Sequence, residues 1–245
     1  MTRKPDPFCH HPELRDLITP PPTSVWRDMT LTRMLTLVAQ SGGDTTLFLS
    51  DEARDAERAA FLKDRPDGDL WVFGYGSLIW DPTIHFAEVR RAYAPTVQRR
   101  FIMRDIGGAR GTMERPGLMA ALDAGGGCHG LAFRIRANLV EDETYRLWMR
   151  EWIAAAYYPR MIPVETAQGG ITALSFLADY DSDFIFPALT HEEQVRYCAT
   201  GEGFLGSSYE YVANIAERFE TLGIADPDLL RLLEDVRAYR DAMNS

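Results

Sequence analysis

The sequence predicts an α+β domain built on an antiparallel or mixed sheet and preceded by a partly helical extension. From residue 69 onward, short apolar runs alternate with glycine-containing turns. One helical segment interrupts these runs, and the last third of the chain carries several helix-start signals. Residues 1–68 differ in texture from the rest. We therefore expect an N-terminal extension over residues 1–68 that packs on, or wraps around, a main domain over residues 69–245.

The extension contains one linker signal and two helical patterns. Pro20-Pro21-Pro22, followed by Thr23 and Ser24, is typical of an extended linker. Apolar residues at helical spacing predict a helix from Met29 to Ala39. A second helix is expected over Asp51 to Lys63, after Ser50 and before a Pro-Asp-Gly turn.

The main domain begins with the apolar run at Trp71 and continues with short runs that predict strands. These runs are Val97 to Met103, Leu118 to Leu122, Cys128 to Arg136, Met161 to Glu165 and Ile171 to Leu177. The expected turns between them lie at Gly108, Pro116-Gly117, Gly125-Gly126-Gly127 and Gly169-Gly170.

Helix caps mark the last third of the chain. Thr190 with Glu193, and Ser207 with Glu210, have the spacing of a capping box. Asp226-Pro227 combines a good N-cap with proline at the first helical position. We expect a helix after each of these signals.

Composition and charge exclude several classes of function. The 245 residues carry 26 basic and 36 acidic side chains, a formal net charge of −10, which argues against binding to nucleic acid or to anionic membranes. Three widely spaced cysteines provide neither a disulfide framework nor a Cys-x-x-Cys metal site. No segment has the apolar length of a signal peptide or a membrane span, so we expect a cytoplasmic protein.

The inserted helix, predicted from Glu141 to about Tyr157, carries an unusual carboxylate. Its apolar stripe includes Tyr145, Trp148 and Met149, while Glu143, Arg146 and Arg150 share a polar face. Glu151 falls on the other flank of the stripe, where its neighbours are Leu147, Ala155, Thr144 and Trp148. Burial there raises the pKa of a carboxyl group towards neutrality, which suits a general acid or base. The alternative is a half-exposed Glu151, or one that pairs structurally with an arginine.

Other catalytic patterns fit poorly. Gly74-x-Gly76 lacks the third glycine of a dinucleotide fingerprint, because Ile79 stands in its place. The residues around Ser77 do not form the Gly-x-Ser-x-Gly pattern of a serine hydrolase. Cys9-His10-His11 is more simply an incidental cluster than a metal site, and Cys128 has no evident activating partner.

Four motifs lie in a characteristic order along the chain. They are WVFGYGSLIWDP from Trp71, GARGTMERPG over Gly108 to Gly117, LWMREWIAAAYY over Leu147 to Tyr158, and GFLGSSYEYV over Gly203 to Val212. Together they resemble ChaC proteins, the glutathione-specific γ-glutamylcyclotransferases, over about Asp69 to Leu222. The chain departs from the family pattern at Met113 and at Ala154-Ala155-Ala156, which bears on substrate preference more than on the reaction.

The resemblance implies a γ-glutamylcyclotransferase-like fold, a mixed β-barrel or curved sheet flanked by helices. It implies that the α-amine of a γ-glutamyl group attacks its own γ-carbonyl, so that glutathione yields 5-oxoproline and Cys-Gly without a metal or organic cofactor. Glu151 falls on the family's acid/base position. The loop that holds the γ-glutamyl group then covers Val72, Phe73, Gly74, Tyr75, Gly76, Ser77 and Leu78.

The physical chemistry of this loop agrees with that role. Glycine permits backbone conformations closed to other residues and a close approach of the main chain to a ligand. Successive N–H groups in such a turn can bind a carboxylate or a developing oxyanion.

Three further residues have two interpretations each. Tyr157 reaches the same pocket or is a core tyrosine at the helix end. Arg110 supplies positive charge for a substrate carboxylate or forms a structural salt bridge. Tyr209 closes the pocket or packs in the core.

Two alternative functions remain open. The chain acts on other γ-glutamyl peptides or amines, or it is a non-catalytic scaffold of the same fold. The partner expected in the catalytic readings is a small molecule, glutathione or a related γ-glutamyl compound.

Overall fold

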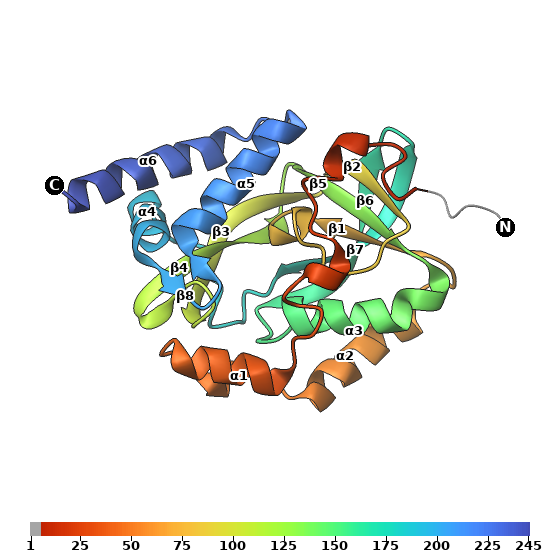
Figure 1. The fold of residues 1–245 in the computed structure, drawn as a ribbon, viewed down its shortest axis with the longest axis horizontal. Coiled ribbons are helices and arrows are strands. Elements are labelled where there is room, and N and C mark those ends of the chain that lie inside the picture. Colours follow the sequence, from red (N-terminus) through yellow and green to blue (C-terminus); the bar gives the residue numbers. More distant parts are fainter. Residues whose placement is uncertain (1–5) are drawn as a thin grey trace.

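The computed structural model describes residues 6–245 and is organised around one curved sheet (Figure 1). Seven strands run in the order β1-β5-β2-β6-β7-β4-β3, and β1 also pairs with β7. That additional pairing closes β1, β5, β2, β6 and β7 into a ring, from which β4 and β3 continue. The strands are β1 (Leu70–Gly74), β2 (Glu88–Ala94), β3 (Val97–Gly107), β4 (Thr112–Ala124), β5 (Cys128–Ile135), β6 (Tyr157–Thr166) and β7 (Gly169–Ala178).

Most neighbouring strands are antiparallel, but two pairings are parallel. Val72 of β1 lies opposite Phe133 of β5 in an antiparallel ladder and opposite Leu174 of β7 in a parallel one. Leu122 of β4 pairs with Leu177 of β7, also in parallel. The mixed β-barrel predicted from the sequence is confirmed.

Helices flank the barrel on two sides. Helices α1 to α3 lie along one side and α4 to α6 along another (Figure 1). Their bounds are α1 (Leu31–Gln40), α2 (Asp51–Lys63), α3 (Val140–Glu151), α4 (His191–Thr200), α5 (Ser208–Leu222) and α6 (Pro227–Met243). A short hairpin of two-residue strands, β8 (Glu202–Gly203) and β9 (Gly206–Ser207), joins α4 to α5.

The predicted caps fix where these helices begin. Both capping boxes form: Thr190 caps α4 and Ser207 caps α5, each with its glutamate bonding back to the cap. The Ser50 side chain accepts the Ala53 N–H at the start of α2. Asp226 accepts the Leu229 N–H at the start of α6, with Pro227 as the first helical residue. Each cap satisfies backbone N–H groups that have no partner within the helix.

Helix α3 is fixed by its aromatic anchor. Trp148 is 1% exposed and packs between Phe61 of α2, with ring centroids 5.4 Å apart, and Phe176 of β7, at 5.1 Å. Truncating such a buried ring typically costs about 3–5 kcal/mol of folding free energy. This contact holds the C-terminal end of α3, where Glu151 lies, against the barrel.

The predicted end of this helix was wrong. Helix α3 ends at Glu151, residues 152–156 form bends, and Tyr157 begins β6 opposite Ala178. The chain leaves the helix through Ala155, whose φ is 47°, although alanine is a good helix former. Pairing of β6 with β7 therefore overrides the local helix preference.

The faces of α3 also differ from the prediction. Tyr145, expected on the apolar stripe, is 45% exposed. Glu143 and Arg150, expected on a polar face, are buried, because the N-terminal segment covers that face.

Several turns and strands depart from the prediction as well. Pro116 and Gly117 lie inside β4 rather than in a turn, and residues 88–94 form a strand that the sequence analysis missed. A Cβ on Gly117 would lie 2.3 Å from the Arg110 carbonyl oxygen, so close packing explains this glycine. Pro21–Thr23 forms a 3₁₀ turn in place of an extended linker.

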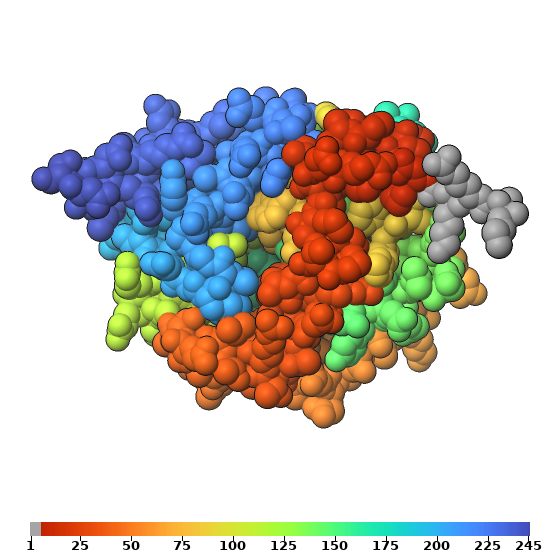
Figure 2. Space-filling model, in the orientation of Figure 1, coloured from red at the N-terminus to blue at the C-terminus, as the bar shows by residue number. Residues whose placement is uncertain are grey.

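The N-terminal segment lies across one face of the molecule (Figure 2). Leu14 and Ile18 join the same apolar core as the barrel strands, and Met34 and Val38 of α1 pack with Met149 of α3. The segment therefore wraps around the main domain as expected, while a domain boundary at residue 68 stays a prediction. No helix among residues 6–245 is long and apolar enough to cross a membrane.

Candidate active site

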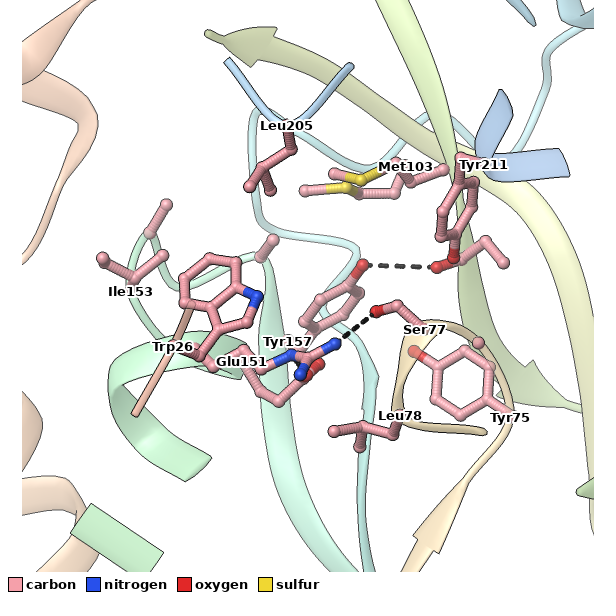
Figure 3. Close-up of a pocket in the computed structure, with 16 residues that line it drawn as sticks. Trp26, Tyr75, Ser77, Leu78, Met103, Glu151, Ile153, Tyr157, Leu205 and Tyr211 are labelled. Atoms are coloured by element: carbon pink, nitrogen blue, oxygen red, sulfur yellow. Dashed lines mark hydrogen bonds and ion pairs between the residues drawn. The ribbon is translucent and has the colours of Figure 1, made fainter. Parts of the chain in front are cut away.

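A cavity of about 130 Å³ opens where β1, α3, α5 and the N-terminal segment meet (Figure 3). Its walls come from segments that are far apart in the sequence. Trp26 and Ile153 lie on one side, and Tyr75 and Ser77 on the other. The lining residues are Trp26, Tyr75, Gly76, Ser77, Leu78, Met103, Met119, Ala120, Arg150, Glu151, Ile153, Ala154, Ala156, Tyr157, Leu205 and Tyr211.

The loop after β1 forms one wall. Ser77–Ile79 is a 3₁₀ turn whose first bond runs from the Ile79 N–H to the Gly76 carbonyl oxygen. The backbone N–H groups of Ser77 and Leu78 therefore have no acceptor within the turn. They are available in principle to an anionic group in the cavity.

The glycines of this loop serve close packing. Neither Gly74 nor Gly76 has a positive φ, although the ψ of Gly76, −128° at a φ of −125°, lies outside the usual β and right-handed α ranges. A Cβ on Gly76 would lie 2.9 Å from the Tyr211 hydroxyl, and one on Gly74 would lie 2.8 Å from the Leu78 Cβ. The two glycines let the loop fold tightly and let Tyr211 reach it.

Glu151 lies at the last position of α3 and lines the cavity (Figure 3). Its side chain is 14% exposed, and its Oε1 lies 3.1 Å from the Nε of Arg150. Burial raises the pKa of the Glu151 carboxyl above its ordinary value, and the Arg150 charge partly opposes that rise. Both interpretations offered by the sequence therefore hold in part: the carboxyl is largely buried in a cavity and is paired with an arginine.

Arg150 connects Glu151 to the loop. Its Nη2 donates to the Ser77 Oγ at 2.8 Å, and its Nη1 donates to the Thr83 Oγ1 at 2.6 Å and to the Asp81 carbonyl oxygen. The guanidinium also lies 5.4 Å from the centre of the Trp26 ring. One fixed cation thus orients the acid, the serine and the turn that follows it.

Three buried tyrosines complete the inner wall. Tyr75, Tyr157 and Tyr211 are each less than a tenth exposed. Burial raises the pKa of all three hydroxyls, that of Tyr211 to about 12, so they remain protonated near neutral pH. The Tyr157 hydroxyl donates to the Ala120 carbonyl oxygen at 3.4 Å. These groups supply neutral hydrogen bonds beside the single carboxyl.

The structure separates the candidate residues into three groups. Glu151, Tyr157 and the residues Tyr75, Gly76, Ser77 and Leu78 share the cavity. Val72 and Phe73 are buried strand residues of β1 that carry the loop, and Gly74 ends that strand. Arg110 lines an adjoining cavity, and Tyr209 lies outside both.

The environment of Arg110 is distinctive. Its guanidinium lies 5.6 Å from the Tyr211 ring centre and donates to the Ser207 carbonyl oxygen at 3.3 Å. Within residues 6–245 no carboxylate forms an ion pair with it, so the structural salt bridge considered from the sequence is not found. Burial lowers the pKa of this guanidinium, as expected for a cation withdrawn from water.

Of the two interpretations of Tyr209, core packing agrees with the structure, and the cavity is lined instead by Tyr211, which the sequence analysis did not single out. The Tyr209 ring packs under the Arg240 guanidinium at 4.4 Å, on the side of α5 that faces α6. Tyr211, two residues further along the helix, projects into the cavity instead (Figure 3). Helical geometry separates the two directions by roughly 200°, so only one of them can face the site.

The N-terminal histidines have ordinary partners. His10 lies 3.2 Å from Glu88, and His11 lies 3.5 Å from Glu13. In the described part of the chain, residues 6–245, no three side chains of the metal-binding types are grouped as ligands.

The cavity combines the elements of an acyl-transfer site. It holds a carboxyl with a raised pKa, a turn with available N–H groups, and several protonated hydroxyls. Such an arrangement can accept and return a proton at one carbonyl group while main-chain donors stabilise the oxygen.

Comparisons with known proteins find relatives over most of the chain. The family model described as ChaC-like protein matches residues 70–239. A glutathione-specific γ-glutamylcyclotransferase of Escherichia coli strain K12 is 34% identical over 202 residues, which cover 79% of this chain and 84% of that protein. A protein of the same description from Schizosaccharomyces pombe is 28% identical over 184 residues. The aligned region covers 67% of this chain and 89% of that protein.

A solved structure matches the fold. The crystal structure of a γ-glutamyl cyclotransferase specific to glutathione from yeast superposes with a TM-score of 0.66. The two chains are 22% identical in sequence, and the superposed region covers 71% of this chain and 98% of the yeast chain. At that identity the likeness concerns the fold.

Proposed function

The chain belongs to the ChaC family, and from this premise we propose that it cleaves glutathione to 5-oxoproline and Cys-Gly as a γ-glutamylcyclotransferase. The observation that carries the proposal is the placement of Glu151 in the same cavity as the Tyr75–Leu78 loop. We also propose that this small-molecule reaction takes place in the cytoplasm.

The proposed reaction needs little beyond positioning. Nucleophile and electrophile belong to one substrate, and holding them in a near-attack geometry is worth effective molarities of about 10⁵ M or more. The substrate amine must first lose a proton, because an ammonium group has no free electron pair. Glu151 accepts that proton in its ionised form and returns one to the nitrogen of the leaving Cys-Gly.

The loop stabilises the charge that develops during attack. As the amine adds to the γ-carbonyl, its oxygen becomes negative. The N–H groups of Ser77 and Leu78, which have no acceptor in the turn, are the donors that we assign to this oxyanion. The hydroxyls of Tyr75, Tyr157 and Tyr211 hold the substrate's polar groups without adding charge.

Purified protein incubated with glutathione tests the proposal. We expect 5-oxoproline and Cys-Gly in equal amounts, without added metal or cofactor. Folded protein that forms no 5-oxoproline above a buffer blank contradicts the proposal and favours a scaffold. A panel of γ-glutamyl dipeptides and amines, ranked by kcat/KM, then shows whether glutathione is the preferred substrate.

Replacing Gly76 with alanine should lower kcat/KM for glutathione at least about tenfold. The new Cβ would lie 2.9 Å from the Tyr211 hydroxyl, so the loop or the tyrosine must move. Gly126→Ala is the matched control, because a Cβ there meets no heavy atom within 4 Å. Equal activity of the two variants would show that the tight contact with Tyr211 does not position the loop.

A further inference from the structure

Residues 19–29, here called the strap, cross the mouth of the active site (Figure 2). The strap is tied to the segment that follows the Tyr75–Leu78 loop. The Thr19 N–H donates to the Trp80 carbonyl oxygen at 2.7 Å, and the Ser24 Oγ donates to the Asp81 carboxylate at 3.0 Å. These bonds fix the strap to the wall that carries Ser77.

A second attachment joins the strap to α3. Both terminal nitrogens of Arg27 bond to the carboxylate of Glu143, at 2.5 and 2.9 Å. The Glu143 side chain is 1% exposed, and its carboxylate also accepts the His85 N–H at 2.9 Å. A bidentate, buried pair of this kind holds one geometry, since separating it leaves a buried charge without a partner.

Between these two attachments, Trp26 projects into the cavity (Figure 3). The backbone N–H of Trp26 donates to the Ser24 Oγ at 3.2 Å, and the centre of its indole ring lies 5.4 Å from the Arg150 guanidinium. Arg150 is the residue that pairs with Glu151 and Ser77. Trp26 therefore has a fixed position beside the catalytic carboxyl.

Trp26 borders two adjoining cavities. One is the inner cavity with Glu151, and the other, of about 210 Å³, is lined by Trp26 together with Val25, Trp80, Asp81 and Arg110. Asp81 is held by the Ser24 hydroxyl and lies 3.7 Å from Arg150, so its charge is already paired. Ser77, Arg150, Leu205 and Tyr211 also line both cavities, which makes them neighbours around a common boundary. The outer cavity holds the Arg110 guanidinium, which forms no ion pair with a carboxylate of residues 6–245, although the negative charges of Glu210 and Asp105 act on it from nearby.

We propose that Trp26 is a specificity-determining residue that packs on the Cys-Gly part of the substrate and directs its carboxylate to Arg110. This assignment rests on the proposed function. The inner cavity takes the γ-glutamyl group, and the outer one takes the dipeptide, whose terminal carboxylate complements the Arg110 cation. Trp26 lies outside residues 70–239, the range that the family model matches. The strap therefore adds an aromatic wall to the active site that the matched residues do not supply.

The test is product inhibition and steady-state kinetics of Trp26→Ala. We expect the KM for glutathione and the inhibition constant of Cys-Gly to rise about tenfold, as for loss of one apolar pocket contact. The inhibition constant of 5-oxoproline should stay unchanged, and kcat should stay within about threefold. Trp26→Phe keeps an aromatic wall and should restore most of the affinity for Cys-Gly.

Phe8→Ala is the matched control. Phe8 lies in the same N-terminal segment and also packs against an arginine, Arg15, at 4.8 Å, but it lines neither cavity. The assignment would be overturned if Trp26→Ala left the KM for glutathione and the inhibition constant of Cys-Gly unchanged. It would also be overturned if the variant bound Cys-Gly and 5-oxoproline more weakly by the same factor. Wild-type protein without 5-oxoproline formation would instead refute the proposed function, so the two failures are distinguishable.

Discussion

Replacing Glu151 with glutamine lowers kcat for 5-oxoproline formation by about 10² or more, with the KM for glutathione changed little. Glutamine preserves the shape and most hydrogen bonds of the side chain but cannot accept the substrate's proton. The loop, Arg150 and the tyrosines remain in place to bind the γ-glutamyl group. Steady-state kinetics of the folded variant give the measurement.

The same substitution should not destabilise the protein near neutral pH. Burial raises the folded-state pKa of Glu151, so its contribution to stability is full below the unfolded pKa and is lost as pH rises through the folded pKa. Glutamine does not titrate, so the variant should melt at or above the wild-type temperature at neutral pH and lose that advantage in acid.

Glu141→Gln provides the matched control for both measurements. Glu141 lies on the same helix, but its side chain is 76% exposed and does not line the cavity. That variant should retain wild-type turnover. Near-normal turnover of folded Glu151→Gln would remove Glu151 from the acid/base role.

Replacing Arg150 with methionine should lower kcat/KM at least about tenfold at neutral pH and move the acid limb of its pH profile upward. The Arg150 charge lowers the pKa of Glu151, and without it burial acts unopposed. A smaller fraction of Glu151 is then ionised at a given pH. Ser77 also loses its hydrogen bond from the guanidinium.

The Arg150 variant should be less stable as well. The guanidinium satisfies the Thr83 hydroxyl and the Asp81 carbonyl oxygen, and each polar group left buried without a partner costs about 1–3 kcal/mol. Arg150→Lys is the informative control. Lysine keeps the positive charge but lacks the planar guanidinium and its several donors. The acid limb of the variant's pH profile should therefore stay near that of the wild type, while its free energy of unfolding falls. An unchanged acid limb in Arg150→Met would show that Arg150 does not tune Glu151.

Local signals in the sequence located the helix and the carboxyl that line the candidate site. Glu151 was marked because Thr144, Leu147 and Trp148 are its neighbours on the helix surface, and all three are buried in the structure. The helix caps were equally readable, because a cap depends on residues within one turn of each other.

Tertiary contacts explain what the sequence did not reveal. Helix α3 ends at Glu151, and the chain bends through residues 152–156 into β6, which the helix preference of three alanines does not disclose. Tyr211 reaches the cavity only because Gly76 leaves room for its hydroxyl. Trp26 joins the site because its neighbours Ser24 and Arg27 bond to Asp81 and Glu143, more than 50 residues away in sequence.

The most direct test of the account is the titration of the Glu151 carboxyl itself. Its ¹³C chemical shift can be followed in protein labelled at glutamate side-chain carboxyls and assigned by comparison with Glu151→Gln. The account predicts a midpoint above the ordinary value of about 4.3, coinciding with the acid limb of kcat/KM for glutathione. A Glu151 carboxyl that titrates in the ordinary range, or at a pH different from that limb, would contradict it.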